Sequence, residues 1–164
     1  MSTPNDRSVV RPAGDPQIGN LATPVNSSTL TVWFINNLPA YRPSLSPQRR
    51  GLEIGMAHGY LLLGPFSLLG PLRNSVVPNL AGLLGTIGLI VILTACLFIY
   101  SAVGVKKPIT TITAPNPPKE LETDEGWSQF TSGFLVGGVG GALFAYLILG
   151  LLSIFGISFK GVFG

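Results

Sequence analysis

Three long apolar stretches are the feature that most constrains what this chain can fold into. They run from Gly51 to Leu72, from Leu80 to Val105 and from Phe130 to Phe159. Each exceeds the roughly 20 residues that a helix needs to cross about 30 Å of hydrocarbon. Of the 164 residues, 46% are hydrophobic and only 10% are charged. The sequence therefore predicts an all-α integral membrane protein with three transmembrane helices.

The segments between the apolar stretches define the domain organisation. We expect a polar N-terminal tail over residues 1–48, transmembrane helices over 49–73, 79–105 and 129–159, a proline-rich loop over 106–128 and a C-terminus over 160–164. Pro65 and Pro71 should kink or end the first helix. Trp33, Phe34 and Tyr41 precede the first helix, and aromatic residues gather in this way at membrane surfaces. We expect this part of the tail to be a short interfacial segment.

Positive charges predict the orientation. With three spans, the tail and the long loop share one side of the membrane, and the other side carries only Arg73 and Lys160. The basic residues of the first side are Arg7, Arg11, Arg42, Arg49, Arg50, Lys106, Lys107 and Lys119. The positive-inside rule therefore places the N-terminus on the cytoplasmic side, or its plastid equivalent, and the C-terminus opposite. The charges form no basic stripe with interleaved aromatics, so nothing indicates nucleic-acid binding.

Small residues recur at helical spacing in all three spans. The repeats are Gly51, Gly55 and Gly59 in the first, Gly82, Gly85 and Gly88 in the second, and Gly133, Gly137, Gly141 and Ala145 in the third. Such repeats let helix backbones approach closely, which favours helix packing in lipid. Either the helices of this chain pack on one another at these positions, or some of the gaps admit a flat ligand or a neighbouring subunit.

Glu53 and His58 are ionisable residues within the first span, and His58 is the only histidine of the chain. An ionisable group at mid-membrane depth costs about 2.5 to 3.5 kcal/mol by insertion scales, so it usually has a partner or a function. On a helix the two side chains point about 140° apart and are displaced by about 7.5 Å. They cannot share one metal ion, which excludes the Glu-x-x-His pattern of di-iron bundles. No group of residues indicates catalysis.

Each of these two residues has two interpretations. His58 offers a ring nitrogen that suits a metal held in a planar macrocycle, with Gly55 and Gly59 leaving room for the ring, or it forms a hydrogen bond to a partner helix. Glu53 follows Arg49 and Arg50 at the spacing of a surface ion pair, which is worth only a few tenths of a kcal/mol. Its alternative interpretation is a second, separate ligand site.

Four stretches of the chain carry a family resemblance: "GDPQIGNLATPVN", "NLPAYRPSLSPQRRGLEIGMAHGYLLLGPFSLLGPLRNS", "NLAGLLG" and "GWSQFTSGFLVGGVGGALFAY". They resemble photosystem I reaction-centre subunit XI, PsaL. The resemblance implies three thylakoid membrane helices with a stromal N-terminus and a lumenal C-terminus. It also implies chlorophyll a with Glu53 and His58 as magnesium ligands, and nearby β-carotene and structural lipid. An oxygen ligand suits magnesium, so the resemblance favours the ligand interpretation of Glu53.

The same resemblance implies a non-catalytic, structural role in which the subunit joins photosystem I monomers into oligomers. Its partners would be the core subunits PsaA and PsaB, small subunits such as PsaI and PsaM, and PsaL of neighbouring monomers. The alternative from a different class is a small membrane transporter or channel subunit. A transport path needs polar groups at mid-membrane depth, and beyond Glu53 and His58 the spans supply only scattered Ser and Thr.

Two loops bear on the kind of oligomer. Trimer-forming relatives typically read GPLRD after the first span, with the aspartate linked to a calcium ion between monomers, whereas this chain reads "GPLRNS" and has Asn74 there. An amide oxygen can ligate calcium but brings no charge, which weakens the case for a calcium site. The "APNPPKE" loop, with Pro115, Pro117 and Pro118, resembles that of relatives forming dimers and tetramers. This favours a tetramer.

Overall fold

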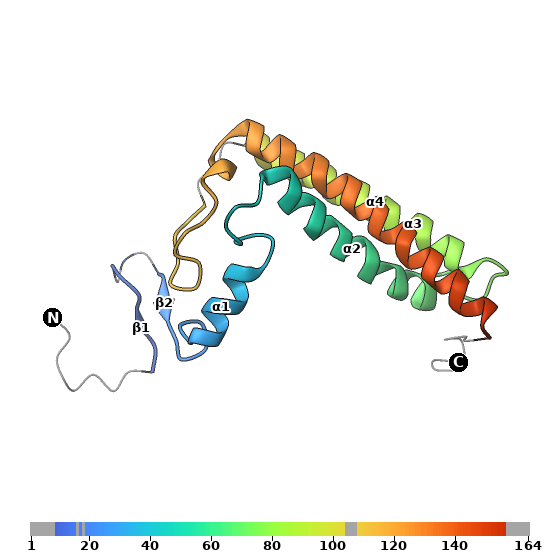
Figure 1. The fold of residues 1–164 in the computed structure, drawn as a ribbon, viewed down its shortest axis with the longest axis horizontal. Helices are drawn as coiled ribbons and strands as arrows, with labels where there is room; N and C mark the ends of the chain where they lie inside the picture. Colours follow the sequence, from blue (N-terminus) through green and yellow to red (C-terminus); the bar gives the residue numbers. More distant parts are fainter. Residues whose placement is uncertain (1–8, 16, 18, 104–107, 157–164) are drawn as a thin grey trace.

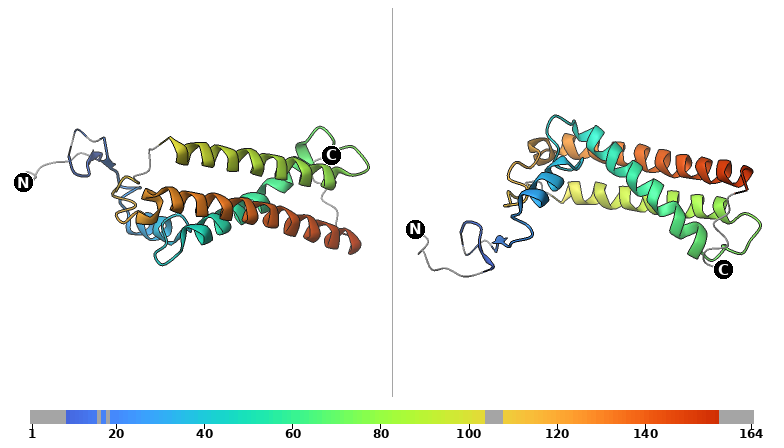
Figure 2. Two further views of the ribbon diagram at one scale, coloured as in Figure 1. Left: turned by 90° about the horizontal axis from the view of Figure 1, so that it is seen from above. Right: turned by 60° about the horizontal axis from the view of Figure 1, so that its bottom comes forward.

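The computed structural model of the chain describes residues 9–15, 17, 19–103 and 108–156. Its centre is a bundle of the helices α2 (Pro47–Leu69), α3 (Pro78–Ala102) and α4 (Asp124–Ile154), shown in Figures 1 and 2. These 3 helices are long and apolar enough to cross a membrane. The predicted all-α fold with three transmembrane helices is confirmed.

Local capping sets where the first and last of these helices begin. The hydroxyl of Ser46 accepts a hydrogen bond from the backbone N–H of Arg49, and Pro47 follows it as the first helical residue, where a missing N–H costs nothing. Thr123 caps α4 in the same way by accepting from the N–H of Gly126 at 3.0 Å. The third long helix consequently begins at Asp124, ahead of the expected residue 129.

The far ends of the helices differ from the expected bounds. The first membrane-spanning helix, α2, continues through Pro65 and ends at Leu69, before Pro71, so Pro65 does not terminate it. α3 is described to Ala102 and α4 to Ile154. The expected ends of these two spans, at residues 105 and 159, lie outside the described residues. So do Arg7, Lys106, Lys107, Lys160 and the expected C-terminal segment 160–164.

Glycines bring α2 and α4 into backbone contact along much of their length. The two helices run parallel, and a Cβ atom at any of these glycines would overlap a backbone carbonyl oxygen of the other helix. The contacts pair Gly51 with Phe130, Gly55 with Phe134, Gly59 with Gly138, Gly133 with Gln48, Gly137 with Leu52 and Gly141 with Met56. We call this set of contacts the glycine ladder. It confirms that the small-residue repeats of the first and third spans pack on each other.

The third member of the bundle, α3, runs antiparallel to the other two. Gly82 of α3 lies against the backbone and hydroxyl of Ser67 on α2, and Ile90 is fully buried against Gly138 of α4. A small apolar core gathers Leu63, Leu83, Ala142 and Ala145. α2 and α3 therefore meet towards the end of α2, and Figure 2 shows them diverging towards its beginning.

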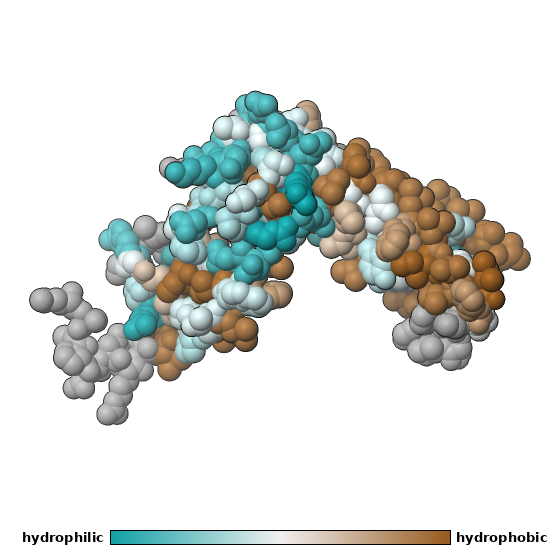
Figure 3. Space-filling model, viewed as in Figure 1, coloured by the Kyte–Doolittle hydropathy of each residue, from teal (hydrophilic) through white to brown (hydrophobic). Residues whose placement is uncertain are grey.

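A second, more polar part of the molecule lies at the end of the bundle where α2 and α4 begin (Figure 1). We call it the head region, residues 9–46 and 108–123. It holds the short strands β1 (Arg11–Pro12) and β2 (Leu21–Ala22), which pair antiparallel, the helix α1 (Thr29–Asn37) and the 3-10 turn η2 (Lys119–Glu122). Figure 3 shows most of the hydrophilic residues over the head region, interrupted by hydrophobic patches, and mostly hydrophobic residues over the bundle.

Two long-range hydrogen bonds join the parts of the head region. The side-chain N–H of Asn36 donates to the carbonyl oxygen of Thr113 at 2.7 Å. The hydroxyl of Thr113 donates to the carbonyl oxygen of Asn26 at 3.0 Å. The proline-rich loop therefore folds onto the N-terminal tail of its own chain. α1 exposes Trp33 and Phe34, and its placement at a membrane surface stays a prediction.

Candidate functional site

The hydrogen bonding of His58 leaves one of its ring nitrogens available as a ligand. Nδ1 lies 2.8 Å from the backbone carbonyl oxygen of Ile54, one turn earlier on α2. A carbonyl oxygen can only accept, so Nδ1 carries the proton of the neutral ring and Nε2 keeps its lone pair. A backbone partner on one nitrogen is the usual arrangement of a metal-ligating histidine. The side chain is exposed on the surface of the bundle.

A groove of about 440 Å³ opens beside His58 where α2 and α3 diverge over α4. Phe134 packs edge-on against the imidazole, with ring centroids 5.5 Å apart. The groove is lined by Ile54, His58, Leu93, Cys96, Leu97, Tyr100, Phe130 and Phe134. Apart from the imidazole, the thiol and the phenol, these walls are hydrocarbon. One free ring nitrogen in an apolar groove offers a single donor atom for the metal of a planar macrocycle and an apolar wall for its flat ring.

The room for such a ring does not come from the glycines that the sequence indicated. We expected Gly55 and Gly59 to leave space next to His58, but the backbone of α4 at Phe134 and Gly138 fills both positions. This expectation is therefore wrong. The space exists because α3 leans away from α2, which the spacing of residues along α2 alone could not reveal.

Glu53 is held by an arginine that sequence spacing did not single out. Nη2 of Arg42 lies 2.7 Å from both carboxylate oxygens of Glu53. Nε of Arg49 lies 3.6 Å from Oε1 of the same carboxylate, as its spacing predicted. Arg42 precedes α2 and reaches Glu53 only because the chain turns back at residues 38–46. A pairing across a turn of this kind carries no periodic signal in the sequence.

Arg50, the other expected partner of Glu53, has a different role. It is only 3% exposed, and its Nη1 donates to the carbonyl oxygens of Pro39, Ala40 and Arg42 at 3.0, 3.3 and 2.7 Å. Arg50 therefore does not pair with Glu53 as expected. Its three hydrogen bonds instead connect α2 to the turn that precedes it. These hydrogen bonds to the backbone satisfy Nη1, whereas the buried Nε of Arg50 has no hydrogen-bond partner in the described part of the chain.

The carboxylate of Glu53 has the donor chemistry of a magnesium ligand. Its side chain is 26% exposed, and each oxygen of an ionised carboxylate has a second lone pair beyond the one that Arg42 occupies. Glu53 does not line the groove beside His58. The two residues thus belong to separate surfaces of α2, as the predicted angle between them requires.

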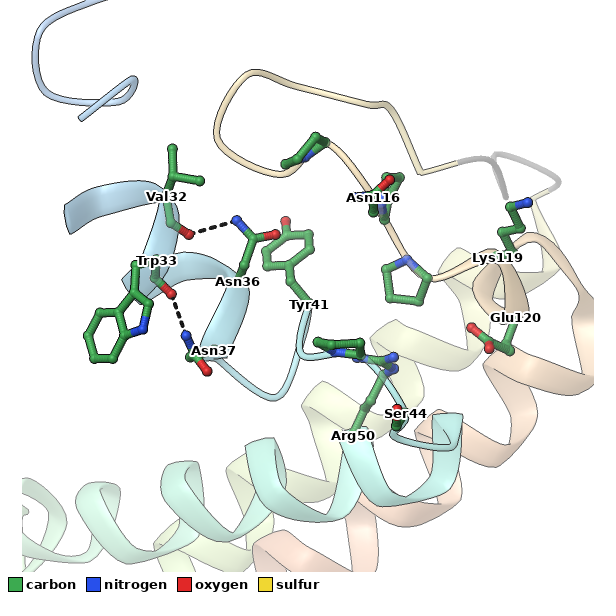
Figure 4. Close-up of a pocket in the computed structure, with 14 residues that line it drawn as sticks. Val32, Trp33, Asn36, Asn37, Tyr41, Ser44, Arg50, Asn116, Lys119 and Glu120 are labelled. Atoms are coloured by element: carbon green, nitrogen blue, oxygen red, sulfur yellow. Dashed lines mark hydrogen bonds between the residues drawn. The ribbon is translucent and has the colours of Figure 1, made fainter. Parts of the chain in front are cut away.

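The candidate interface residues lie at opposite ends of the molecule. The loop prolines help line a cavity of about 560 Å³ between α1, the turn before α2 and η2 (Figure 4). Pro115 is exposed, Pro117 is half-buried and Pro118 is buried against its own chain. Asn74 is exposed in the turn between α2 and α3. Of these residues, Pro115 and Asn74 present the most surface to another molecule.

The chain is similar to known proteins over most of its length. A family model described as photosystem I reaction centre subunit XI matches residues 8–154. A protein of that name from Trichormus variabilis is 59% identical over 90% of this chain and 86% of its own length. One from Synechococcus elongatus is 61% identical over 85% of this chain and 86% of its own length. One from Picosynechococcus is 62% identical over 84% of this chain and 91% of its own length.

Proposed function

Because the chain belongs to the photosystem I reaction centre subunit XI family, we propose that it is a multi-pass thylakoid membrane subunit that binds antenna chlorophyll a and joins photosystem I monomers. Its role as a structural subunit follows from the family, whose members are named as a photosystem subunit and not as an enzyme. The transporter alternative has no such support.

The free Nε2 of His58 is the observation that carries the pigment proposal. Because Nδ1 is bonded to Ile54, the imidazole cannot rotate its ligand nitrogen away without losing a hydrogen bond. Phe134 packs edge-on against the same ring and also restrains its orientation. Bound chlorophyll a supplies the absorption of light, and the chain supplies a fixed ligand and an apolar wall. β-carotene and structural lipid, which the family resemblance implies, would occupy the exposed apolar faces of the same bundle.

Glu53 is the second proposed magnesium ligand. Its oxygens are hard ligands of the kind that magnesium prefers, and Arg42 compensates the charge that an acidic residue brings into a membrane helix. The two ligands serve two pigments, since Glu53 stands apart from the groove that His58 lines.

The experiment measures chlorophyll in photosystem I complexes that carry variants of this chain. The complexes are purified from a cyanobacterial host in which this chain replaces the resident subunit XI. His58→Leu and Glu53→Ala should each remove a single chlorophyll, and the double variant should remove both. Leu61→Ala is the matched control, because Leu61 is an exposed apolar residue of the same helix. An unchanged pigment content in both single variants would refute the proposal.

The proposed partners are PsaA, PsaB, PsaI, PsaM and the PsaL of neighbouring monomers, with a tetramer as the favoured assembly. Support comes from the exposed loop residue Pro115, which stands out from a loop already anchored by Thr113. Pro115→Arg should therefore reduce the tetramer fraction on a native gel without unfolding the loop. Pro118 is buried, so a variant there would test the fold of the head region instead. An unaltered oligomer distribution in Pro115→Arg would remove the support for this interface.

The proposed orientation places the head region on the stromal side. It contains Arg11, Arg42 and Lys119, whereas the turn between α2 and α3 contains Arg73. Trypsin added to the stromal face of thylakoid membranes should cut after Lys119, which is exposed, and should spare Arg73. Cleavage at Arg73 from that face would reverse the orientation.

A further inference from the structure

Arg42 makes the closest polar contact of any side chain to Glu53 in the described part of the chain. Its Nη2 lies 2.7 Å from Oε1 and 2.7 Å from Oε2. The two residues are separated by eleven positions, and Arg42 lies outside the helix that carries Glu53. We propose that Arg42 is a positioning residue for the second pigment site: it neutralises the Glu53 carboxylate and fixes its direction, so that the carboxylate can ligate the magnesium of a chlorophyll. The proposal rests on the proposed role of Glu53.

Charge gives the first reason. A chlorophyll is a neutral magnesium complex, so a bare carboxylate ligand would leave a net negative charge in a membrane helix, which is unfavourable. A neighbouring guanidinium removes this net charge.

Geometry gives the second reason. Because one guanidinium nitrogen contacts both oxygens, the carboxylate cannot rotate freely about its terminal bond. Each oxygen still has a lone pair on the side away from Arg42. The Glu53 side chain is 26% exposed and Arg42 is 38% exposed, so the pair is not sealed inside the protein. A ligand has access to the carboxylate while the ion pair remains intact.

The fold provides a dedicated support for Arg42. Nη1 of Arg50 donates to the carbonyl oxygen of Arg42 itself and to those of Pro39 and Ala40. Ser44 adopts a left-handed backbone conformation with φ of 67°, which an L-residue rarely adopts, and this turns the chain back towards α2. The helix that carries Glu53 thus also holds the turn that returns Arg42 to it.

Arg49 is the less suitable counter-charge. Its Nε lies 3.6 Å from a single oxygen of Glu53, and its side chain is 70% exposed. An exposed pair at this distance is screened and weakly oriented. The structure therefore assigns the main neutralising role to Arg42.

Photosystem I complexes carrying Arg42→Met test this assignment through their chlorophyll content and their low-temperature absorption difference spectrum. Arg42→Met should lose the same single chlorophyll, and the same absorption band, as Glu53→Ala. Arg73→Met is the matched control, because Arg73 lies in the turn at the other end of α2, and it should keep the full pigment content. Full pigment content in Arg42→Met would overturn the proposal.

The double variant Arg42→Met/Glu53→Gln separates charge neutralisation from simple support of the fold. A glutamine retains an oxygen ligand but has no charge to neutralise, so the double variant should regain the chlorophyll that Arg42→Met loses. Loss of the chlorophyll in the double variant but not in Glu53→Gln would mean that Arg42 only supports the turn, which contradicts the proposal. If Glu53→Ala itself loses no pigment, Glu53 is not a chlorophyll ligand, and the role proposed for Arg42 falls with it. This outcome differs from the one in which Glu53→Ala loses a chlorophyll and Arg42→Met does not, which would refute the role of Arg42 alone.

Discussion

Nδ1 of His58 and the backbone carbonyl oxygen of Ile54 lie 2.8 Å apart, and this one contact decides which ring nitrogen faces the groove. A histidine whose Nδ1 were free could present either nitrogen to a ligand. Here the carbonyl oxygen of Ile54 on the same helix holds Nδ1, so Nε2 is the nitrogen available to a ligand in the groove.

The groove can be filled without altering the ligand. Cys96→Trp places an indole in the groove that Cys96 lines, and it should displace the pigment assigned to His58 although His58 remains. Pigment analysis of purified complexes gives the result. Ile92→Trp is the control, because Ile92 is on the same helix, is 59% exposed and does not line the groove. If Cys96→Trp keeps its full pigment content, the pigment does not lie in this groove.

The glycine ladder predicts opposite outcomes at two adjacent positions of α4. A Cβ atom at Gly141 would meet the backbone of Met56, whereas a Cβ atom at Gly140 would have nothing within 4 Å. Gly141→Leu should therefore force α2 and α4 apart at a cost of at least about 1–3 kcal/mol, and Gly140→Leu should be tolerated. Thermal release of the subunit from detergent-solubilised complexes measures the difference. Equal stabilities would contradict the ladder.

Two neighbouring asparagines test the closure of the head region. Asn36 donates to the carbonyl oxygen of Thr113 across the head region, while Asn37 donates only locally, to Trp33. Asn36→Ala removes a hydrogen bond worth about 1 kcal/mol and should speed proteolysis of the loop at Lys119. Asn37→Ala should leave the rate unchanged. Identical rates in the two variants would show that the Asn36–Thr113 bond does not hold the loop.

The turn between α2 and α3 offers a test of calcium dependence. Asn74 is exposed there, and Asn74→Asp adds a carboxylate, a stronger calcium ligand than an amide. We expect the variant to shift towards trimers when calcium is added, since a change of about 1.4 kcal/mol alters association tenfold. Native mass measurement with calcium and with a chelator gives the populations. If the populations of oligomers change neither with the substitution nor with the chelator, this turn holds no calcium site.

The sequence predicted the parts of this fold that repeat with a regular period. Apolar length located the three helices, and the spacing of Gly51, Gly55 and Gly59 predicted a close helix contact. The period could not say which helix they contact, because any small-residue repeat can pack on any other. The interpretation of Gly55 and Gly59 as room for a ring failed for this reason. Their space is filled by α4.

The two ionisable residues of the candidate site could be picked out from the sequence, but the residues that support them could not. Glu53 and His58 stand out because ionisable residues are rare in membrane helices. Arg42 does not, because its contact with Glu53 depends on a non-helical turn held by Arg50. Spacing rules describe neighbours on one helix, as they did for Arg49. They give no information about a residue that returns across a turn.

The glycine ladder joins two helices that the ribosome makes at different times. Synthesis proceeds from the N-terminus, so α2 is complete before α3 and α4 exist. Until α4 enters the bilayer, the glycines of α2 face lipid, and no hydrophobic force draws them to a partner. The Arg42–Glu53 ion pair has no such delay, because both of its residues have left the ribosome when α2 is inserted. The nascent helix can thus enter the bilayer with its acidic side chain already neutralised, before its partner helix has been translated.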